Sequence, residues 1–157
     1  KEEALQKIKT YGLLTIPQDE EVLFSDKNSK GFVKQGFSWT EDWGVWSNSK
    51  KAEIFFTRAE RGSSSLNLIF RTFGNLQHEQ NIIFYVNGEK ALSLNNIQPW
   101  VEMEQKLIID EAQPEMITIR MEIPTAISPN ELDANNQDTR KLGIGLIKMK
   151  YQKEKTE

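Results

Sequence analysis

The sequence predicts an all-β protein, an antiparallel β-sandwich of jelly-roll type with a short helical lead-in at its N-terminus. Short runs rich in β-branched and aromatic residues follow one another along the 157 residues, and Gly, Pro, Asn, Asp and Ser separate them. These runs do not alternate with long helical patterns, which argues against parallel βαβ units. Short strands at this spacing are typical of a sandwich or jelly roll.

The expected elements begin with a helical segment and continue as strands. Residues 2–10 are helix-like, with Ala4, Leu5 and Ile8 on one side, although a helix of this length is marginal by itself. Extended structure is expected from Leu13 onward. The eight expected strands are Glu21–Phe24, Ala52–Arg58, Ser65–Phe73, Asn81–Asn87, Lys90–Leu94, Gln105–Asp110, Met116–Ile123 and Leu142–Tyr151.

Alternation along these strands predicts which residues lie in the core. In the third expected strand, Leu66, Leu68 and Phe70 fall on one face, and Asn67, Ile69 and Arg71 fall on the other. Successive side chains of a strand point to opposite faces, so the first three are expected in the core. The second face is expected to meet solvent or another layer.

The dipeptide Asn87-Gly88 is the clearest turn signal. It lies between β-rich runs over residues 82–86 and 90–94. Asn and Gly tolerate the positive φ angles of a type I′ turn, whose twist matches that of the flanking strands. We therefore expect a tight hairpin here.

Length, charge and composition narrow the class of protein. A chain of 157 residues is expected to form one domain. Its net charge is −3 and its basic residues are scattered, whereas nucleic-acid binding depends on a basic stripe, so no nucleic-acid partner is expected. The chain has no cysteine, which excludes disulfides, thiolate zinc sites and cysteine nucleophiles.

We expect three segments along the chain. Residues 1–19 form a linker or lead-in helix, residues 20–151 the β-sandwich accessory domain, and residues 152–157 a charged tail. No apolar run approaches the roughly 18–20 residues that a membrane-spanning helix needs. Because the sequence opens with Lys1 rather than Met, we expect it to be part of a longer protein.

Residues 36–47 are the most informative stretch for function. They hold three of the four tryptophans, Trp39, Trp43 and Trp46, together with two adjacent carboxylates. In an extended chain Trp39 and Trp43 share a face and Trp46 points to the other, so at least one ring is expected in the core. Two interpretations stay open. All three rings pack the core, or one or two of them stack on a sugar.

Glu41, Asp138 and Arg140 are the charged residues singled out with the tryptophans. A guanidinium can bind a carboxylate or a phosphate through two parallel hydrogen bonds, so Arg140 either contacts a ligand or ties down an internal acid. Glu41 either satisfies backbone N–H groups or pairs with Arg140, or it accepts bonds from a ligand. If Glu41 satisfies buried donors, Glu41→Ala should destabilise the fold by about 1–3 kcal/mol.

The sequence holds no convincing catalytic constellation. Adjacent residues of a strand diverge, so Glu41 and Asp42 cannot form the facing pair, roughly 5–9 Å apart, that glycoside hydrolysis needs. No catalytic residue is therefore assigned. Asp133 and Asp138, in the polar loop before the last strand, are candidate calcium ligands through their oxygens, although their spacing matches no EF-hand. No other cofactor is expected.

Motifs in distant parts of the chain together resemble a known module. They are Gly36-Phe37-Ser38-x-x-Glu41-x-Trp43-Gly44-x-Trp46-Ser47, a strand beginning at Ala52, Ile123-Pro124, Ser128-Pro129-Asn130-Glu131 and Asp138-x-Arg140-Lys141-Leu142-Gly143-Ile144-Gly145-Leu146. This pattern resembles a β-sandwich accessory domain of uncharacterised function at the end of bacterial phosphoglycerol transferases that decorate periplasmic glucans. The domain also accompanies membrane glycosyltransferases and other surface-polysaccharide proteins. The likeness covers about residues 20–151.

The resemblance implies a non-catalytic, glycan-associated module of an envelope polysaccharide-modifying enzyme, a glycosyltransferase or a phosphoglycerol transferase. The chemistry of those transferases belongs to a separate catalytic domain, so no catalytic residue is carried over. The implied location is the periplasmic or extracytoplasmic face of a bacterial membrane, with the parent protein anchored in it. The residues proposed to contact a glycan are Trp39, Glu41, Trp43, Trp46, Asp138 and Arg140.

The alternative is a structural docking domain without a ligand of its own. Such a domain would pack on a catalytic or membrane domain of the same protein, and its motif residues would form a hydrogen-bonded core. This alternative predicts that all three tryptophans are buried and that the neighbourhood of Glu41 and Arg140 is closed.

Overall fold

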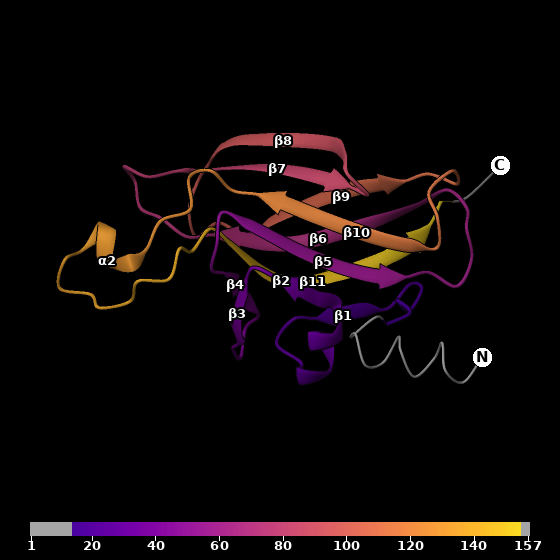
Figure 1. Ribbon diagram of the computed structural model, residues 1–157, viewed down its shortest axis with the longest axis horizontal. Coiled ribbons are helices and arrows are strands. Elements are labelled where there is room, and N and C mark those ends of the chain that lie inside the picture. The colour runs from indigo at the N-terminus through magenta and orange to yellow at the C-terminus, as the bar shows by residue number, and fades with distance from the viewer. Residues whose placement is uncertain (1–13, 155–157) are drawn as a thin grey trace.

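The computed structural model describes residues 14–154, which form two antiparallel β-sheets packed face to face (Figure 1). The strands are β1 (Glu21–Leu23), β2 (Val33–Gln35), β3 (Phe37–Thr40), β4 (Val45–Ser47), β5 (Lys51–Thr57), β6 (Ser64–Thr72), β7 (Gln80–Val86), β8 (Glu89–Ile97), β9 (Met103–Ile109), β10 (Met116–Glu122) and β11 (Ile144–Lys153). The six-stranded sheet has the order β3-β4-β11-β6-β9, and β1 also pairs with β11. The five-stranded sheet has the order β2-β5-β10-β7-β8.

This arrangement confirms the predicted antiparallel β-sandwich. Every pairing between these strands is antiparallel. The helix expected over residues 2–10 lies outside the described residues. Within residues 14–154, no helix has the length and apolar character needed to cross a membrane.

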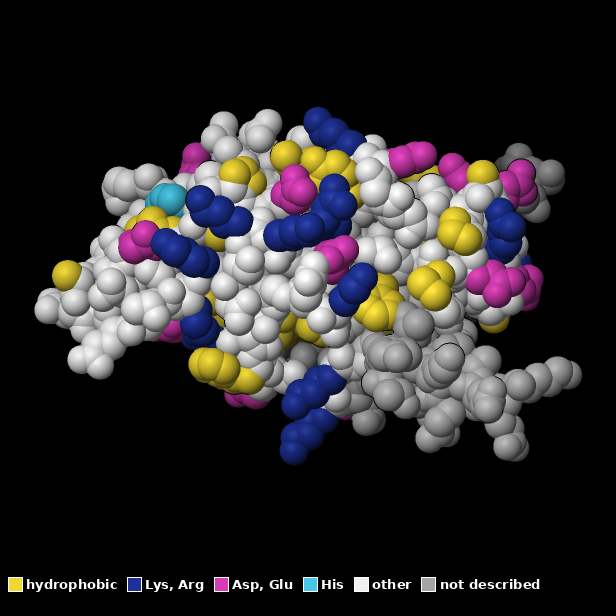
Figure 2. Space-filling view, viewed as in Figure 1, with side chains coloured by type: hydrophobic (Ala, Val, Ile, Leu, Met, Phe, Trp, Pro, Cys, Tyr) yellow, Lys and Arg dark blue, Asp and Glu magenta, His cyan; other side chains and the backbone are white. Residues whose placement is uncertain are grey.

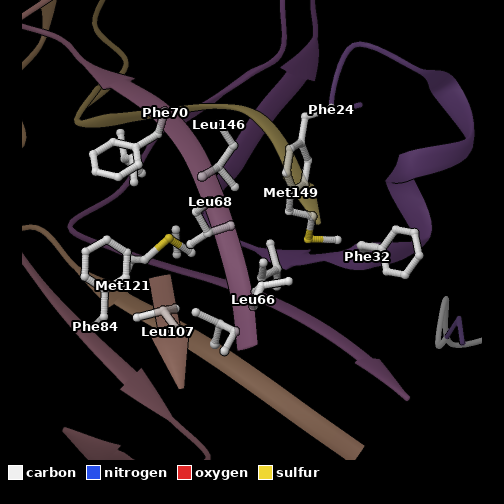
Figure 3. Close-up of a cluster of buried hydrophobic side chains, with 14 of the residues drawn as sticks. Phe24, Phe32, Leu66, Leu68, Phe70, Phe84, Leu107, Met121, Leu146 and Met149 are labelled. Carbon is white, nitrogen blue, oxygen red and sulfur yellow. The ribbon is translucent and has the colours of Figure 1, made fainter. Parts of the chain in front are cut away.

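The core lies between the two sheets (Figure 3). Leu66, Leu68 and Phe70 of β6 are fully buried, as the alternation predicts. Phe70 meets Phe84 of β7 across the sandwich, with ring centroids 6.1 Å apart. The other face of β6, which carries Arg71, is therefore the outer face of the six-stranded sheet.

The hairpin at Asn87-Gly88 joins β7 to β8 as predicted. Both residues have positive φ, 48° at Asn87 and 87° at Gly88, as a type I′ turn requires. The Asn87 side chain also accepts a hydrogen bond of 2.7 Å from the backbone N–H of Thr118. The turn is thereby tied to the neighbouring strand β10.

Three short strands that were not predicted from the sequence lie in or just before the tryptophan stretch, namely β2, β3 and β4. Each has three or four residues, too few for alternation to be recognised, and glycines separate them. Gly36 has a φ of +82°, and a Cβ there would lie 2.1 Å from the Lys51 carbonyl oxygen. This close approach lets the stretch fold back on β5 and then cross to the other sheet.

The loop between β10 and β11 contains a one-turn helix, α2 (Pro129–Leu132), where the sequence predicted only a long irregular segment. Ser128 and Glu131 form a capping box. The Ser128 hydroxyl accepts from the Glu131 N–H at 3.1 Å, and the Glu131 carboxylate accepts from the Ser128 N–H at 2.9 Å. Part of the signature therefore has a structural role.

Arg58 follows β5 and is buried to 1% exposure, and its role was not predicted from the sequence. All five of its N–H groups donate hydrogen bonds, which is the full capacity of a guanidinium. The acceptors are the carbonyls of Gly62, Asp110, Gln113 and Pro114 and the hydroxyl of Ser64. Arg58 thus joins two loops at its end of the sandwich.

Acidic and basic side chains are interspersed over the face of the molecule shown in Figure 2, which the five-stranded sheet presents. No continuous basic stripe is visible on this face. On this face, the basic residues are scattered among acidic ones, as expected from the sequence.

Candidate functional site

Five of the six residues expected to contact a ligand belong to two side-chain groups near the N-terminal end of β11. The first group, which we call the Trp39 platform, consists of Ser38, Trp39, Asp138 and Arg140. The second group, which we call the Arg71 cage, consists of Trp43, Trp46, Arg71 and Trp100. Glu41 lies in the turn between β3 and β4.

Trp39, on the edge strand β3, is 64% exposed. The Arg140 guanidinium lies over its ring, 4.3 Å from the centroid, a cation–π contact. Because one face of the ring rests on Arg140 while most of the residue is exposed, the opposite face is open to solvent. Trp39 is the outward-pointing ring that one interpretation of the sequence required.

Arg140 is held rigidly under Trp39 by Asp138 and Ser38. Its Nε donates to both Asp138 carboxylate oxygens at 3.0 and 3.1 Å, and its Nη2 donates to Oδ2 at 2.6 Å. Its Nη1 donates to the Ser38 hydroxyl at 2.9 Å. These bonds connect the loop before β11 to β3 and fix the plane of the guanidinium.

The same contacts set the protonation of the pair. The hydrogen bonds from Arg140 lower the pKa of Asp138 against the opposing effect of burial. The hydrogen bonds to Asp138 raise the pKa of Arg140, and the charges of Asp138 and Glu41 add to this. Both groups are therefore ionised at neutral pH. Asp138 is suited to holding Arg140 and unsuited to donating a proton.

The Glu41 carboxylate has no hydrogen bond or ion pair to any residue in the described range 14–154. Its backbone N–H donates to the Gly44 carbonyl at 2.7 Å in the turn. The expected pairing of Glu41 with Arg140 is not formed, because Asp138 takes that position. The Glu41 oxygens remain available as hydrogen-bond acceptors close to a cationic group.

Trp43 and Trp46 pack edge to face, with ring centroids 4.9 Å apart. The prediction that Trp46 points away from Trp43 is therefore wrong, because the turn before β4 breaks the extended alternation on which it depended. Trp46 is buried and Trp43 is partly buried. A Cβ at Gly145 of β11 would lie 2.8 Å from both rings, so this position requires glycine.

Arg71 and Trp100 complete the cage, and neither was predicted from the sequence as a site residue. The Arg71 guanidinium lies 3.9 Å from the Trp43 ring centroid, 5.6 Å from that of Trp46 and 5.5 Å from that of Trp100. In the register of the sheet, Gly145 lies opposite both Trp46 and Arg71. No local pattern signals this group, because it depends on strands that pair over long sequence separations.

The two calcium candidates are both engaged in protein contacts. Asp133 accepts a hydrogen bond of 3.0 Å from the Asn135 N–H, and Asp138 is bound by Arg140. Across residues 14–154, no three His, Asp or Glu side chains come together as a potential metal site.

Solved structures of low sequence identity resemble this fold. A family GH115 4-O-methyl-α-glucuronidase, described as specific for decorated arabinogalactans, matches with a TM-score of 0.53 at 7% identity, over 89% of this chain and 18% of that one. A family 35 carbohydrate-binding module from Clostridium thermocellum gives 0.45 at 13% identity, over 83% and 97%. An acetyl xylan esterase from Butyrivibrio proteoclasticus gives 0.43 at 14% identity, over 90% and 32%.

The chain thus spans about a third of that esterase and less than a fifth of the glucuronidase. At such identities a likeness shows the fold alone, and the match to the glucuronidase supports the β-sandwich. No curated protein matches the sequence.

One family does match, over residues 18–153, and it is described as a domain of unknown function, DUF7024. The match includes every motif of the signature, from Gly36 to Leu146. The motifs likewise resembled a β-sandwich domain of uncharacterised function. The chain belongs to the DUF7024 family.

Proposed function

We propose that this domain is a non-catalytic glycan-binding module and that a sugar ring stacks on the Trp39 platform. The observation that carries the proposal is Trp39, whose ring is 64% exposed and yet held from behind by Arg140. An indole face is a flat apolar surface beside a polar edge, and a sugar ring offers a complementary apolar face with hydroxyls around it.

The platform is organised before any ligand arrives. Arg140 is fixed by Asp138 and Ser38, so the support of the Trp39 ring is already ordered. Ordering a side chain in advance removes part of the entropic cost of binding. Glu41 adds free carboxylate oxygens that can accept hydrogen bonds from sugar hydroxyls.

A shallow pocket beside the platform supports the same ligand class. Its volume is about 260 Å³, and its lining includes Ser38, Trp39 and Thr40 of β3. Sites for drug-sized ligands enclose roughly 300–1,000 Å³. A pocket below that range suits a single sugar ring within a longer chain better than a wholly enclosed molecule.

The docking alternative fits the geometry less well. It predicted that all three tryptophans would be buried and that Glu41 would lie in a closed network. Trp39 is exposed, and the Glu41 carboxylate forms no hydrogen bond or ion pair in the described part of the chain. We therefore favour glycan binding.

We also propose that the parent protein is an envelope polysaccharide-modifying enzyme of the glycosyltransferase or phosphoglycerol transferase type. The support is the signature, which resembles the accessory domain of such enzymes. The domain would then lie on the periplasmic or extracytoplasmic side of a bacterial membrane, on a membrane-anchored parent. The sequence of the full-length gene product tests this, and neighbouring domains without transferase motifs would contradict it.

Calorimetric titration with neutral gluco-oligosaccharides tests the platform. Trp39→Ala should weaken binding at least tenfold, about 1.4 kcal/mol, because the stacking surface is lost. Trp39→Phe should retain part of the affinity. Met116→Ala, which shortens an exposed apolar side chain outside both groups, is the matched control and should bind like the unmodified domain.

Two outcomes would contradict the platform. One is equal affinity of Trp39→Ala and the unmodified domain for every sugar that binds. The other is the absence of any binding to neutral or anionic oligosaccharides at millimolar concentration.

A further inference from the structure

Arg71 lies on the outer face of the six-stranded sheet, and no acidic residue of the described chain pairs with its charge. Its guanidinium makes no hydrogen bond or ion pair within residues 14–154, and its Nε is buried without a hydrogen-bond partner. Its terminal Nη1 and Nη2 atoms are not among the buried unpaired atoms, so they reach solvent. The half of the guanidinium that can bind an anion through two parallel bonds is therefore open.

Three tryptophan rings hold this guanidinium in place. Trp43 lies closest, with its centroid 3.9 Å from the Arg71 Cζ, and the rings of Trp46 and Trp100 flank it. Aromatic faces satisfy part of the positive charge without using its hydrogen-bonding capacity. They also exclude water from its sides, which strengthens any charge interaction made at its open end.

Trp100 is an independent sign of function in the same place. It has a φ of +68°, in the left-handed region that bulky residues rarely adopt. Its N–H donates to the Thr72 carbonyl at 2.9 Å and its Nε1 to the Gly74 carbonyl at 3.0 Å, and these bonds hold the strained conformation. The result is a fixed ring, 52% exposed, at the edge of the cage. Strain of this kind gathers at functional sites.

Acidic residues beside β6 do not neutralise Arg71. Glu104 of β9 pairs with Ile69 of β6, Glu102 lies just before β9, and neither forms an ion pair with Arg71 within residues 14–154. Their charges add to the raised pKa of Lys148, which is due first to its hydrogen bond with Glu21. A guanidinium that keeps its full charge beside an open aromatic ring is complementary to a charged sugar.

We propose that the Arg71 cage binds an oxyanion carried by a glycan, a carboxylate or a phosphate substituent, while the sugar ring lies against Trp100. Both oxyanions match the two parallel N–H groups of a guanidinium, and such charge-assisted bonds are about twice as strong as neutral ones. This inference rests on the proposed glycan-binding function, but it uses a different surface and names the ligand class.

Affinity for charged and neutral versions of the same sugar tests the proposal. Tetragalacturonate is compared with its methyl ester, and glucose 6-phosphate with glucose. The unmodified domain should bind at least one charged form tenfold or more tightly than its neutral counterpart. The two pairs show whether a carboxylate or a phosphate is preferred.

Variants at Arg71 identify the residue responsible. Arg71→Gln should remove the preference for the charged form and leave the affinity for the neutral forms unchanged. Arg71→Lys should retain only part of the preference, because an ammonium lacks the two parallel N–H donors of a guanidinium. Lys90→Gln removes one exposed positive charge elsewhere and should keep the full preference. Near-UV circular dichroism establishes whether each variant is folded. If Arg71→Gln does not fold, Arg71→Lys alone tests whether the charge preference depends on Arg71.

The possible results separate this proposal from the preceding one. Equal affinity for charged and neutral forms, or a preference that survives in both Arg71 variants, overturns the cage and leaves the Trp39 platform standing. A charge preference that depends on Arg71, together with neutral binding that is indifferent to Trp39→Ala, overturns the platform and leaves the cage standing. A purely structural Arg71 would change thermal stability in both variants without changing the ratio of affinities.

Discussion

Individual polar residues in this domain differ in whether a partner inside the fold already satisfies them. Asp138 and Arg140 bind each other and thereby support Trp39. Glu41 and Arg71 lie in the same region, and their charged groups have no hydrogen-bonding partner in the described residues. Asp138 and Arg140 thus support the Trp39 ring, whereas the charged groups of Glu41 and Arg71 have hydrogen-bonding capacity left for a ligand.

Glu41→Ala should change the free energy of unfolding by no more than about 0.5 kcal/mol, the range of ordinary surface substitutions. The sequence alone allowed a loss of about 1–3 kcal/mol, on the condition that Glu41 satisfied buried donors. That condition is not met, because its carboxylate accepts no bond within residues 14–154. Urea denaturation measures the difference. A loss above about 1 kcal/mol would mean that Glu41 has a structural partner.

Arg58→Met should destabilise the fold by at least about 3 kcal/mol, because buried acceptors in two loops lose their donors together. Arg61→Met is the matched control. Arg61 donates to two carbonyls of the same loop, but it is exposed, so water can replace it. A loss below about 1 kcal/mol is expected there. Similar losses for the two variants in urea denaturation would contradict the assigned role of Arg58.

Among the elements, the long and regular strands were predictable and the short ones were not. β6 and the Asn87-Gly88 hairpin carry strong local signals in alternation and turn chemistry. β3 and β4 are too short for such signals, and α2 is a single turn defined by its capping box. Three residues of the Trp39 platform, Trp39, Asp138 and Arg140, were singled out from the sequence, whereas Ser38 was not. The Arg71 cage could not be predicted, because Arg71, Gly145 and Trp46 meet only through strand pairing.

The α2 element should make stability depend on pH through Glu131. Its pKa is lowered from 4.5 to about 2 by the ion pair with Lys141 first, and then by the hydrogen bonds from Ser128. A carboxylate with a lowered pKa in the folded state stabilises the fold above its unfolded value, and this contribution is lost as the pH falls from about 4.5 to about 2.

Glu131→Gln should therefore lower the melting temperature at neutral pH and flatten its decline over that acidic range. Differential scanning calorimetry across this range measures both effects. Parallel curves for Glu131→Gln and the unmodified domain would show that another group governs the acid response.

The whole domain is a two-sheet sandwich in which β3 and β4 lie beside β11 in the six-stranded sheet (Figure 1). Strand pairing brings together signature residues that are far apart in the sequence, such as Ser38 with Arg140 and Trp46 with Gly145. We propose that the Trp39 platform stacks a sugar ring and that the Arg71 cage binds an oxyanion, which together would suit a glycan with charged substituents.

Stacking of a sugar on Trp39 can be tested by an NMR titration that follows the four indole N–H signals of the domain. Assigned through single Trp→Phe variants, they report separately on each ring. A glycan that binds as proposed should shift the Trp39 signal strongly and saturably, and the signal of buried Trp46 least. A saturable response in which the Trp39 signal does not move, or no response at millimolar sugar, would show that Trp39 is not a sugar-binding surface.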